Sequence, residues 1–257
     1  MSDWKPGLYL KFEKQRTQPS IDLASRIDIT APRRIIDIGC GPGNSTSVLK
    51  GRWPGAAITG LDSSPAMIAQ AGETDKDITW VCADASGDLG ALGRFNIVFS
   101  NAAIQWMPDH EKLLPSLFSL LENGGVLAVQ APNTTDMPIH IALQSLVQRG
   151  SWQTKLGSVS THSTYAAPYY YDILSALTAD IDLWETHYHH VMDSHNALVQ
   201  WYSSTGLRPY LNALENESDK AAFLADFEDA LKHAYPAQSD AHVLFPFVRI
   251  FFMAKKA

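Results

Sequence analysis

The sequence predicts an α/β protein built on a doubly wound parallel sheet, and two observations support this prediction. Apolar runs alternate with segments of helical spacing through the first two-fifths of the chain, and these runs are nearly continuous. Such strands are typical of a parallel sheet whose two faces are both covered by helices. Sheets of this kind bind ligands beyond the carboxyl ends of their strands, so the residues that close each strand are the first functional candidates.

Five strands are expected in this part of the chain. They read RRIIDIG, AAITGLD, ITWVCAD, FNIVFSN and GVLAVQA, and they begin near Arg33, Ala56, Ile78, Phe95 and Gly125. Helices are expected between them at residues 45–50, 64–70 and 110–121. Ser63 or Ser64 marks the start of the second helix, because serine is a good helix cap and the following Pro65 suits a first turn.

The rest of the chain has a looser pattern. MPIHIALQSLVQRG, YYYDILSAL and residues 194–235 have helical spacing, IDLWETHYHHVM alternates like a strand, and VLFPFVRIFFMAKK is the expected last strand. A helical insertion therefore precedes the last strand. We expect a single domain with four parts: an N-terminal lid segment at 1–30, a ligand-binding core at 31–132, remaining sheet and a helical cover at 133–242, and the last strand at 243–257.

Composition and charge exclude several classes of protein. With 46% hydrophobic and 18% charged residues the chain is an ordinary globular protein, and its net charge of -7 offers no basic surface for nucleic acid. The N-terminus has no apolar signal core and no stretch reaches membrane-spanning length, so we expect a cytoplasmic protein without membrane contact. The two cysteines and the group His187, His189 and His190 lack metal-ligand spacing, so no metal is expected and these histidines are interpreted as edge or surface residues.

The stretch IIDIGCGPGN, residues 35–44, has the position of the first strand-to-helix turn. Glycine at 39, 41 and 43 allows a sharp turn and lets a ligand lie against bare backbone. A dinucleotide fingerprint would need a third glycine at Asn44, so that match fails. The pattern with Asp37 two residues before the first glycine is the one carried by S-adenosylmethionine-dependent methyltransferases, whose cofactor has an ammonium and a cationic sulfonium near which a carboxylate is electrostatically favourable.

Polar residues close the next three strands. Asp62 is suited to accept both ribose hydroxyls of an adenosine, Asp84 to accept from the adenine amino group, and Asn101 to face the gap where a substrate approaches. Each has a structural alternative as well, because Asp62 can cap the following helix and Asp84 can belong to an ordinary turn. Four suitable residue types at successive strand ends together favour the methyltransferase interpretation.

Beyond these motifs, the chain resembles the trans-aconitate 2-methyltransferase family, within the class I methyltransferases. The segments ITGLDSSPAMIA, NAAIQWMPDH, GVLAVQAP and STGLRPYL carry the resemblance in order and spacing over essentially the whole length, and NAAIQWMPDH and STGLRPYL are the more specific. The resemblance implies a seven-stranded Rossmann-like sheet with an antiparallel last strand. It also implies an enzyme that transfers a methyl group from S-adenosyl-L-methionine to a carboxylate of trans-aconitate, giving a monomethyl ester.

These observations predict a site made of three groups of residues. The cofactor-binding group is Asp37, Gly39, Cys40, Gly41, Gly43, Asp62, Ser63, Met67, Asp84, Ala85 and Asn101. The group that positions the reactants is Asn101, Gln105 and Trp106, with Gln105 ranked above Trp106 because a tryptophan more often serves packing. The substrate-binding group is Arg208, Arg16, Tyr9 and Arg249.

Arginines are expected in the substrate group because a tricarboxylate needs donors and a guanidinium binds a carboxylate bidentately. Arg208 in GLRP is the first choice, against the alternative of a solvated face or a surface ion pair. Tyr9 and Arg16 belong to a segment that either folds over the site or packs on the core as a helix. No catalytic triad is expected, because a carboxylate is already ionised at neutral pH.

Two other functions stay open at this point. One is a methyltransferase that acts on a hydroxyl or an amine of another small molecule, which would need a general base near the transferred methyl group. The other is a cofactor-binding module without turnover. The expected partner is a small tricarboxylate, and the protein is expected to be a monomer.

Overall fold

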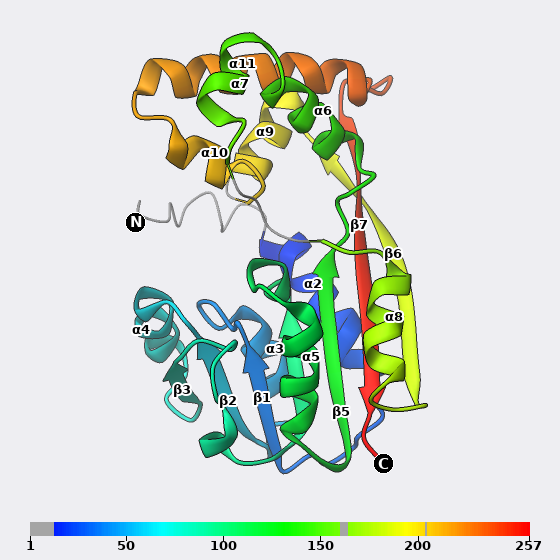
Figure 1. Ribbon diagram of the computed structural model, residues 1–257. Helices are drawn as coiled ribbons and strands as arrows, with labels where there is room; N and C mark the ends of the chain where they lie inside the picture. Colours follow the sequence, from blue (N-terminus) through cyan, green and yellow to red (C-terminus); the bar gives the residue numbers. More distant parts are fainter. Residues whose placement is uncertain (1–12, 160–163, 204) are drawn as a thin grey trace. The chain divides into compact units, whose positions relative to one another are not determined.

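The structure is a computed structural model of the 257-residue chain, and it describes residues 13–159, 164–203 and 205–257. Seven strands of this described part form one sheet in the order β3-β2-β1-β4-β5-β7-β6 (Figure 1). Their bounds are Arg34–Ile38 for β1, Ala57–Asp62 for β2, Thr79–Cys82 for β3, Phe95–Asn101 for β4, Leu121–Pro132 for β5, Ile181–Met192 for β6 and Val243–Lys255 for β7.

The order of the strands confirms the predicted doubly wound sheet. β1 pairs in parallel with both β2 and β4, β2 with β3, and β4 with β5. The last strand, β7, pairs antiparallel with β5. The direction of winding reverses between β1 and β4, which places the switch point of the sheet beside the glycine loop that follows β1.

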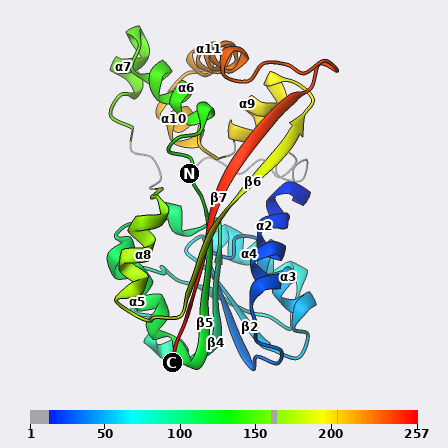
Figure 2. The same cartoon turned by 90° about the vertical axis from the view of Figure 1, so that its right-hand side faces the viewer.

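The described residues group into two compact units. Among the described residues, the sheet unit holds 16–132, 164–186 and 249–257, and the helical unit holds 13–15, 133–159, 187–203 and 205–248. In the sheet unit, Figure 2 shows α5 (His110–Ser119) and α8 (Ala167–Ser175) on one face of the sheet, with α2 (Glu13–Arg26) and α3 (Asn44–Arg52) on the other. The helix α4 (Pro65–Thr74) follows β2, and the short helices η1 (Gly90–Leu92) and η2 (Ile104–Trp106) flank β4.

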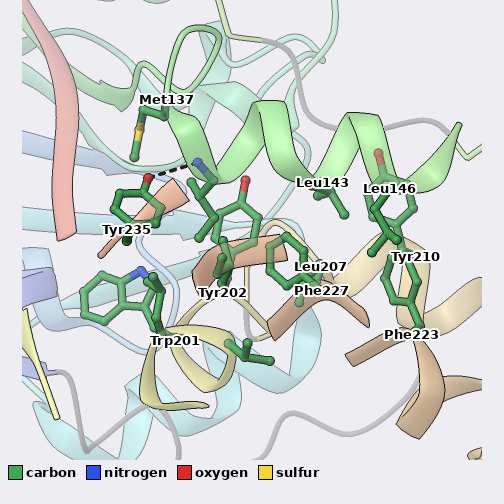
Figure 3. Packing of buried hydrophobic residues seen from close by; sticks show 14 of the residues in the cluster. Met137, Leu143, Leu146, Trp201, Tyr202, Leu207, Tyr210, Phe223, Phe227 and Tyr235 are labelled. Carbon is green, nitrogen blue, oxygen red and sulfur yellow. Dashed lines mark hydrogen bonds between the residues drawn. The ribbon is translucent and has the colours of Figure 1, made fainter. Parts of the chain in front are cut away.

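The helical unit is built around its own apolar core. It contains α6 (Pro138–Val147), α7 (Gly150–Leu156), α9 (His195–Ser203), α10 (Arg208–Ala213) and α11 (Glu217–Ala234). Aromatic side chains dominate this core, among them Tyr202, Tyr210, Phe223 and Phe227, each no more than 2% exposed (Figure 3). The Tyr235 hydroxyl accepts a hydrogen bond of 2.9 Å from the first free N–H of α6, at Ile139, which satisfies a donor that a helix start leaves unpaired.

One expectation about local structure was wrong, and another holds in part. Strand β5 begins at Leu121, four residues before the expected Gly125, because Leu121 pairs with Phe95 across an irregularity of the ladder. The three histidines belong to β6, which is an edge strand of the sheet as expected, but they are not uniformly at the surface. His187 and His189 are exposed, but His190 is 8% exposed and packs against the ring of Trp201, since alternation along β6 turns it to the opposite face.

Candidate functional site

The three glycines of the loop after β1 all have positive φ, at 70° for Gly39, 54° for Gly41 and 98° for Gly43. Their surroundings differ. A Cβ at Gly39 would overlap the Cβ of Ala103, and one at Gly43 would lie 3.0 Å from the ring of Trp80. A Cβ at Gly41 would meet no atom of the described residues within 4 Å. Gly39 and Gly43 are therefore required by the protein's own packing, and Gly41 is the glycine that leaves open space beside bare backbone.

Asp37 lies at 0% exposure beneath this loop. Its Oδ2 accepts hydrogen bonds of 2.7 Å from the hydroxyls of Ser45 and Thr46, which are the second and third residues of α3. Its Oδ1 is buried and has no hydrogen-bond partner in the described part of the chain. Burial raises the pKa of the Asp37 carboxyl from 3.8 to about 6, and the nearby charge of Asp62 adds to this rise.

Asp62, the last residue of β2, connects two parts of the predicted site. One carboxylate oxygen accepts from the N–H of Gly41 at 3.0 Å and the other from the N–H of Ser64 at 2.8 Å. Ser64 is the N-cap of α4, with Pro65 in the first turn as expected. Each carboxylate oxygen has a second lone pair, so the two backbone bonds leave acceptor capacity for a ligand.

Three predicted cofactor contacts lie near the ends of β2 and β3. Asp84 is exposed two residues beyond β3, and its carboxylate accepts from the N–H of Ser86 at 2.8 Å, which is a local turn bond. Ser63 is exposed and Met67 is half-buried in the first turn of α4. Asp84 and Ser63 are thus available at the surface of the sheet unit, as a ligand would require.

Two further predicted cofactor residues, Cys40 and Ala85, are buried at 4% and 3% exposure. Burial raises the pKa of the Cys40 thiol. This thiol is therefore uncharged at neutral pH, and its environment is that of a packing residue.

The residues after β4 form a second polar turn. Asn101 ends β4, and its Oδ1 is buried without a partner in the described chain. Gln105 is 6% exposed, and its Nε2 donates to the carbonyl of Ala102 at 2.7 Å, while its Oε1 is buried and likewise unpartnered. Trp106 is 50% exposed. The buried His110 supports this turn from below, because its Nε2 lies 2.8 Å from the carbonyl of Ile104.

The predicted substrate-binding residues are distributed over both units. Arg208 is the first residue of α10 in the helical unit, it is half-buried, and no residue of the described chain pairs with its guanidinium. Arg249 belongs to the sheet unit, is 5% exposed and donates from Nη1 to Oε1 of Gln130 at 3.3 Å. Arg16 lies in α2, but its side chain and all of Tyr9 lie outside the described residues.

Sequence reasoning missed Gln130 and Trp80. Gln130 is fully buried within β5 and bonds Arg249, but its segment GVLAVQA was interpreted only as an apolar strand. The signal was present, because a glutamine inside a buried run needs a polar partner. The ring of Trp80 lies over Gly60 and approaches Gly43, which explains why both positions hold glycine.

The geometry fits a cationic ligand at the switch point. Two acceptor oxygens, Oδ1 of Asp37 and Oδ1 of Asn101, are buried on neighbouring strands without partners in the described chain, and Gly41 leaves open space in the loop that follows Asp37 and β1. Buried acceptors of this kind are costly unless a donor or cation meets them. The ammonium and sulfonium groups of S-adenosylmethionine are such partners.

The sheet order, the glycine loop at the switch point and the acidic strand ends define a class I methyltransferase. Residues 35–125 match a family described as a methyltransferase domain. The chain is 41% identical to the trans-aconitate 2-methyltransferase of an Escherichia coli O157:H7 strain, over 100% of this chain and 99% of that protein. It is also 41% identical to the protein of that name from Methylobacterium radiotolerans, over 100% of both chains. The chain therefore belongs to the trans-aconitate 2-methyltransferase family.

Solved structures agree with this fold. The YcgJ protein of Bacillus subtilis superposes with a TM-score of 0.59 at 14% identity, over 93% of this chain and 99% of that chain. The plantazolicin methyltransferase superposes with a TM-score of 0.55 at 15% identity, over 98% and 91%. At such identities the likeness concerns the fold. With the family established by sequence, the chain is a methyltransferase whose cofactor is S-adenosylmethionine, as the sequence predicted.

No described helix is both long and apolar enough to cross a membrane. Within the same residues, no group of three histidine, cysteine, aspartate or glutamate side chains is arranged to hold a metal ion.

Proposed function

We propose that this enzyme is a carboxyl O-methyltransferase that converts trans-aconitate to a monomethyl ester. The observation that carries the proposal is identity of 41% along the whole chain to relatives named for that reaction. Whole-length identity matters here, because the match includes the helical unit as well as the sheet unit, and function depends on the site and not on the fold alone.

The proposed reaction requires little acid–base catalysis by the protein. A substrate carboxylate is ionised at neutral pH and is already a nucleophile, so no side chain needs to remove a proton. S-adenosylmethionine, when bound, supplies an electrophilic methyl group on a cationic sulfonium. The tasks left to the chain are to hold the carboxylate in line with that methyl group and to exclude water, since attraction between opposite charges is stronger in a dry site.

One observation favours a carboxylate over a hydroxyl or amine acceptor. The described part of the sheet unit contains a single histidine, His110, and both of its ring nitrogens are engaged. Nε2 faces the Ile104 carbonyl and Nδ1 lies 3.2 Å from the hydroxyl of Tyr170. Burial also lowers the pKa of His110. An imidazole so occupied is unsuited to act as the general base that a hydroxyl or amine acceptor would require.

The same proposal assigns roles to the predicted residues. Asp37, Asp62, Asp84, Asn101 and the loop around Gly41 would hold the cofactor, together with the neighbouring Gly39, Cys40, Gly43, Ser63, Met67 and Ala85. Gln105 and Trp106, with Asn101, would border the methyl-transfer position. Arg208 remains the first candidate for a substrate carboxylate, because it is a half-buried guanidinium without a partner in the described chain.

The test is a reaction of the purified protein with S-adenosylmethionine and trans-aconitate, followed by mass spectrometry. The expected product gains the mass of one methylene group and appears with an equal amount of S-adenosylhomocysteine. Parallel reactions with cis-aconitate, citrate, a phenol and a primary amine separate the alternatives. Methylation of the phenol or amine in preference to the acids would overturn the carboxyl assignment, and cofactor binding without any product would favour a module without turnover.

Four expectations stay predictions: the cytoplasmic location, the monomeric state, the absence of a nucleic-acid partner and the single-domain organisation.

A further inference from the structure

Four polar residues of the sheet unit lie in a row on one face of the sheet. Asp37 of β1 is in register with Phe99 of β4, and Asn101 lies two residues further along the same strand. Asn101 is in register with Gln130 of β5, and Arg249 of β7 pairs two residues beyond Gln130 on that strand. Because side chains alternate between the faces of a sheet, partners in register and residues two apart share a face.

Arg249 fixes the direction of the Gln130 amide. A guanidinium can only donate hydrogen bonds, so the oxygen of the amide must face Arg249, as the 3.3 Å contact between Nη1 and Oε1 shows. The Nε2 group of Gln130 is thereby turned away from Arg249. This Nε2 is buried and has no hydrogen-bond partner in the described chain.

The row therefore changes polarity along its length. On β1 and β4 it offers unpartnered acceptors, at Oδ1 of Asp37 and Oδ1 of Asn101. On β5 it offers an unpartnered donor, at Nε2 of Gln130, backed by the charge of Arg249. Neighbouring strands are about 4.8 Å apart, so a cation held at Asn101 and an anion held at Gln130 would be neighbours.

We propose that Gln130 is a ligand-binding residue whose Nε2 donates to a carboxylate, and that Arg249 is the positioning residue that orients it. This inference rests on the proposed function for the identity of the acid. The substrate is the expected source of the carboxylate, because Gln130 lies on the far side of Asn101 from the glycine loop. The amino-acid carboxylate of the cofactor is the other source with the same chemistry. Since Nε2 is shielded from water, binding must also shift the side chains that cover it.

The first experiment compares Gln130→Glu and Gln130→Met with the wild type. Glutamate keeps the shape and pairs with Arg249 but replaces the donor by an anion, and methionine removes the hydrogen bond with little change of volume. For a substrate contact, kcat/KM for trans-aconitate should fall at least tenfold in Gln130→Met and further in Gln130→Glu, while affinity for S-adenosylhomocysteine is unchanged. Gln144→Glu in the helical unit is the matched control, because that amide pairs with the hydroxyl of Tyr210, which can donate to a carboxylate.

Binding measurements separate the two sources of the carboxylate. If the cofactor supplies it, both Gln130 variants should lose affinity for S-adenosylhomocysteine but keep affinity for 5′-methylthioadenosine, which lacks the amino-acid part. Wild-type values for kcat/KM and for both nucleosides, in variants that melt like the wild type, would overturn the proposal. If the wild-type protein fails to methylate trans-aconitate, the proposed function fails, but this inference can still be tested. The nucleoside affinities and the side-chain amide NMR signal of Gln130, followed during titration with trans-aconitate, then decide it. An amide signal that shifts with neither ligand would count against it.

The positioning role of Arg249 has its own test. If Arg249 acts through Gln130, Arg249→Lys should lower kcat/KM severalfold in the wild-type background but have little further effect in Gln130→Met. Equal effects in both backgrounds would show that Arg249 acts independently of Gln130, and would overturn the positioning role. A melting temperature measured for each variant distinguishes either result from loss of folded protein.

Discussion

The carboxylate of Asp62 accepts a hydrogen bond of 3.0 Å from the backbone N–H of Gly41, so the end of β2 is tied to the middle glycine of the loop that follows β1. The second oxygen of Asp62 accepts from the N–H of Ser64 at the start of α4. One carboxylate thus fixes two loops that border the switch point of the sheet. A side chain so placed fixes the two loops, and we propose that it also binds the cofactor directly.

Replacing Asp62 by alanine is expected to weaken cofactor binding. The loss of charge-assisted hydrogen bonds to a ribose, together with the loosened Gly41 loop, should cost about 3 kcal/mol, or roughly a hundredfold in Kd. Calorimetric titration with S-adenosylhomocysteine measures this. Asp88→Ala is the control, because exposed Asp88 makes the same kind of turn bond, to Gly90 at 2.8 Å, outside the predicted site. Wild-type affinity in Asp62→Ala would remove Asp62 from the site.

Gly41→Val is expected to abolish cofactor binding in a protein that still folds. Within the described part of the chain no atom lies within 4 Å of the added Cβ, so the cost to folding is the backbone strain of a side chain at φ 54°, about 1–3 kcal/mol. The side chain would fill the space assigned to the cofactor.

Gly124 offers a matched control for this strain. It also has positive φ, at 75°, and open space at its Cβ, but it lies near the start of β5 and not at the carboxyl ends of the strands. Gly124→Val should therefore lower the melting temperature to a similar extent and leave the Kd for S-adenosylhomocysteine unchanged. A folded Gly41→Val protein that binds the nucleoside normally would contradict the assignment of the loop.

The buried carboxyl of Asp37 predicts a pH dependence of stability. Its pKa is raised in the folded protein, from 3.8 to about 6, so folding favours the protonated form. The folded state therefore binds more protons between these values, and stability decreases as pH rises through this window. The full difference is about 3 kcal/mol, since one pKa unit corresponds to about 1.4 kcal/mol.

Asp37→Asn removes this titration. Urea unfolding of both proteins from pH 4 to pH 8 should show the variant gaining stability relative to the wild type as pH rises to about 6, and a constant difference above it. A difference that does not vary with pH would contradict the raised pKa. The ionised carboxylate is also the form that attracts a cation, so affinity of the wild type for S-adenosylmethionine should increase over the same window.

The fold could be predicted because its strands are locally encoded. Runs such as the one ending in Asp37 are apolar, β-branched and closed by polar residues, and they need no distant contact to be recognised. The glycine loop was equally easy to recognise in the sequence, but the contacts that require glycine at each position were not. That Gly39 faces Ala103 and Gly43 faces Trp80 depends on segments distant in the sequence.

The less predictable features are those decided by pairing between strands. The role that we propose for Gln130 depends on its hydrogen bond with Arg249. This arginine is 119 residues away in sequence and becomes a neighbour only when β7 pairs with β5. The burial of His190 similarly requires the ring of Trp201 from another element. The pattern within one segment indicates which face of the sheet a residue occupies, but not which side chains of another element contact it there.

Arg208→Lys tests the assignment of the substrate arginine. Arg208 is half-buried at the start of α10, and its guanidinium has no partner in the described chain. These properties suit a group that binds an anionic ligand. Lysine keeps the positive charge but cannot form two parallel hydrogen bonds to a carboxylate. We therefore expect kcat/KM for trans-aconitate to fall about tenfold to a hundredfold, by one lost charge-assisted bond, while affinity for S-adenosylmethionine stays near that of the wild type.

The alternative roles of Arg208 predict a different pattern. A solvated arginine would give normal kinetics in the lysine variant, and a packing residue would lower the melting temperature and affect both ligands together. Arg149→Lys is the matched control, since Arg149 lies in the same helical unit but is exposed at the N-cap of α7. Steady-state kinetics of both variants, with varied trans-aconitate and then varied cofactor, decide the matter when compared with their melting temperatures. Unchanged kcat/KM for trans-aconitate in Arg208→Lys would exclude a bidentate role and leave Arg16 and the pair of Gln130 with Arg249 as the groups that bind the acid.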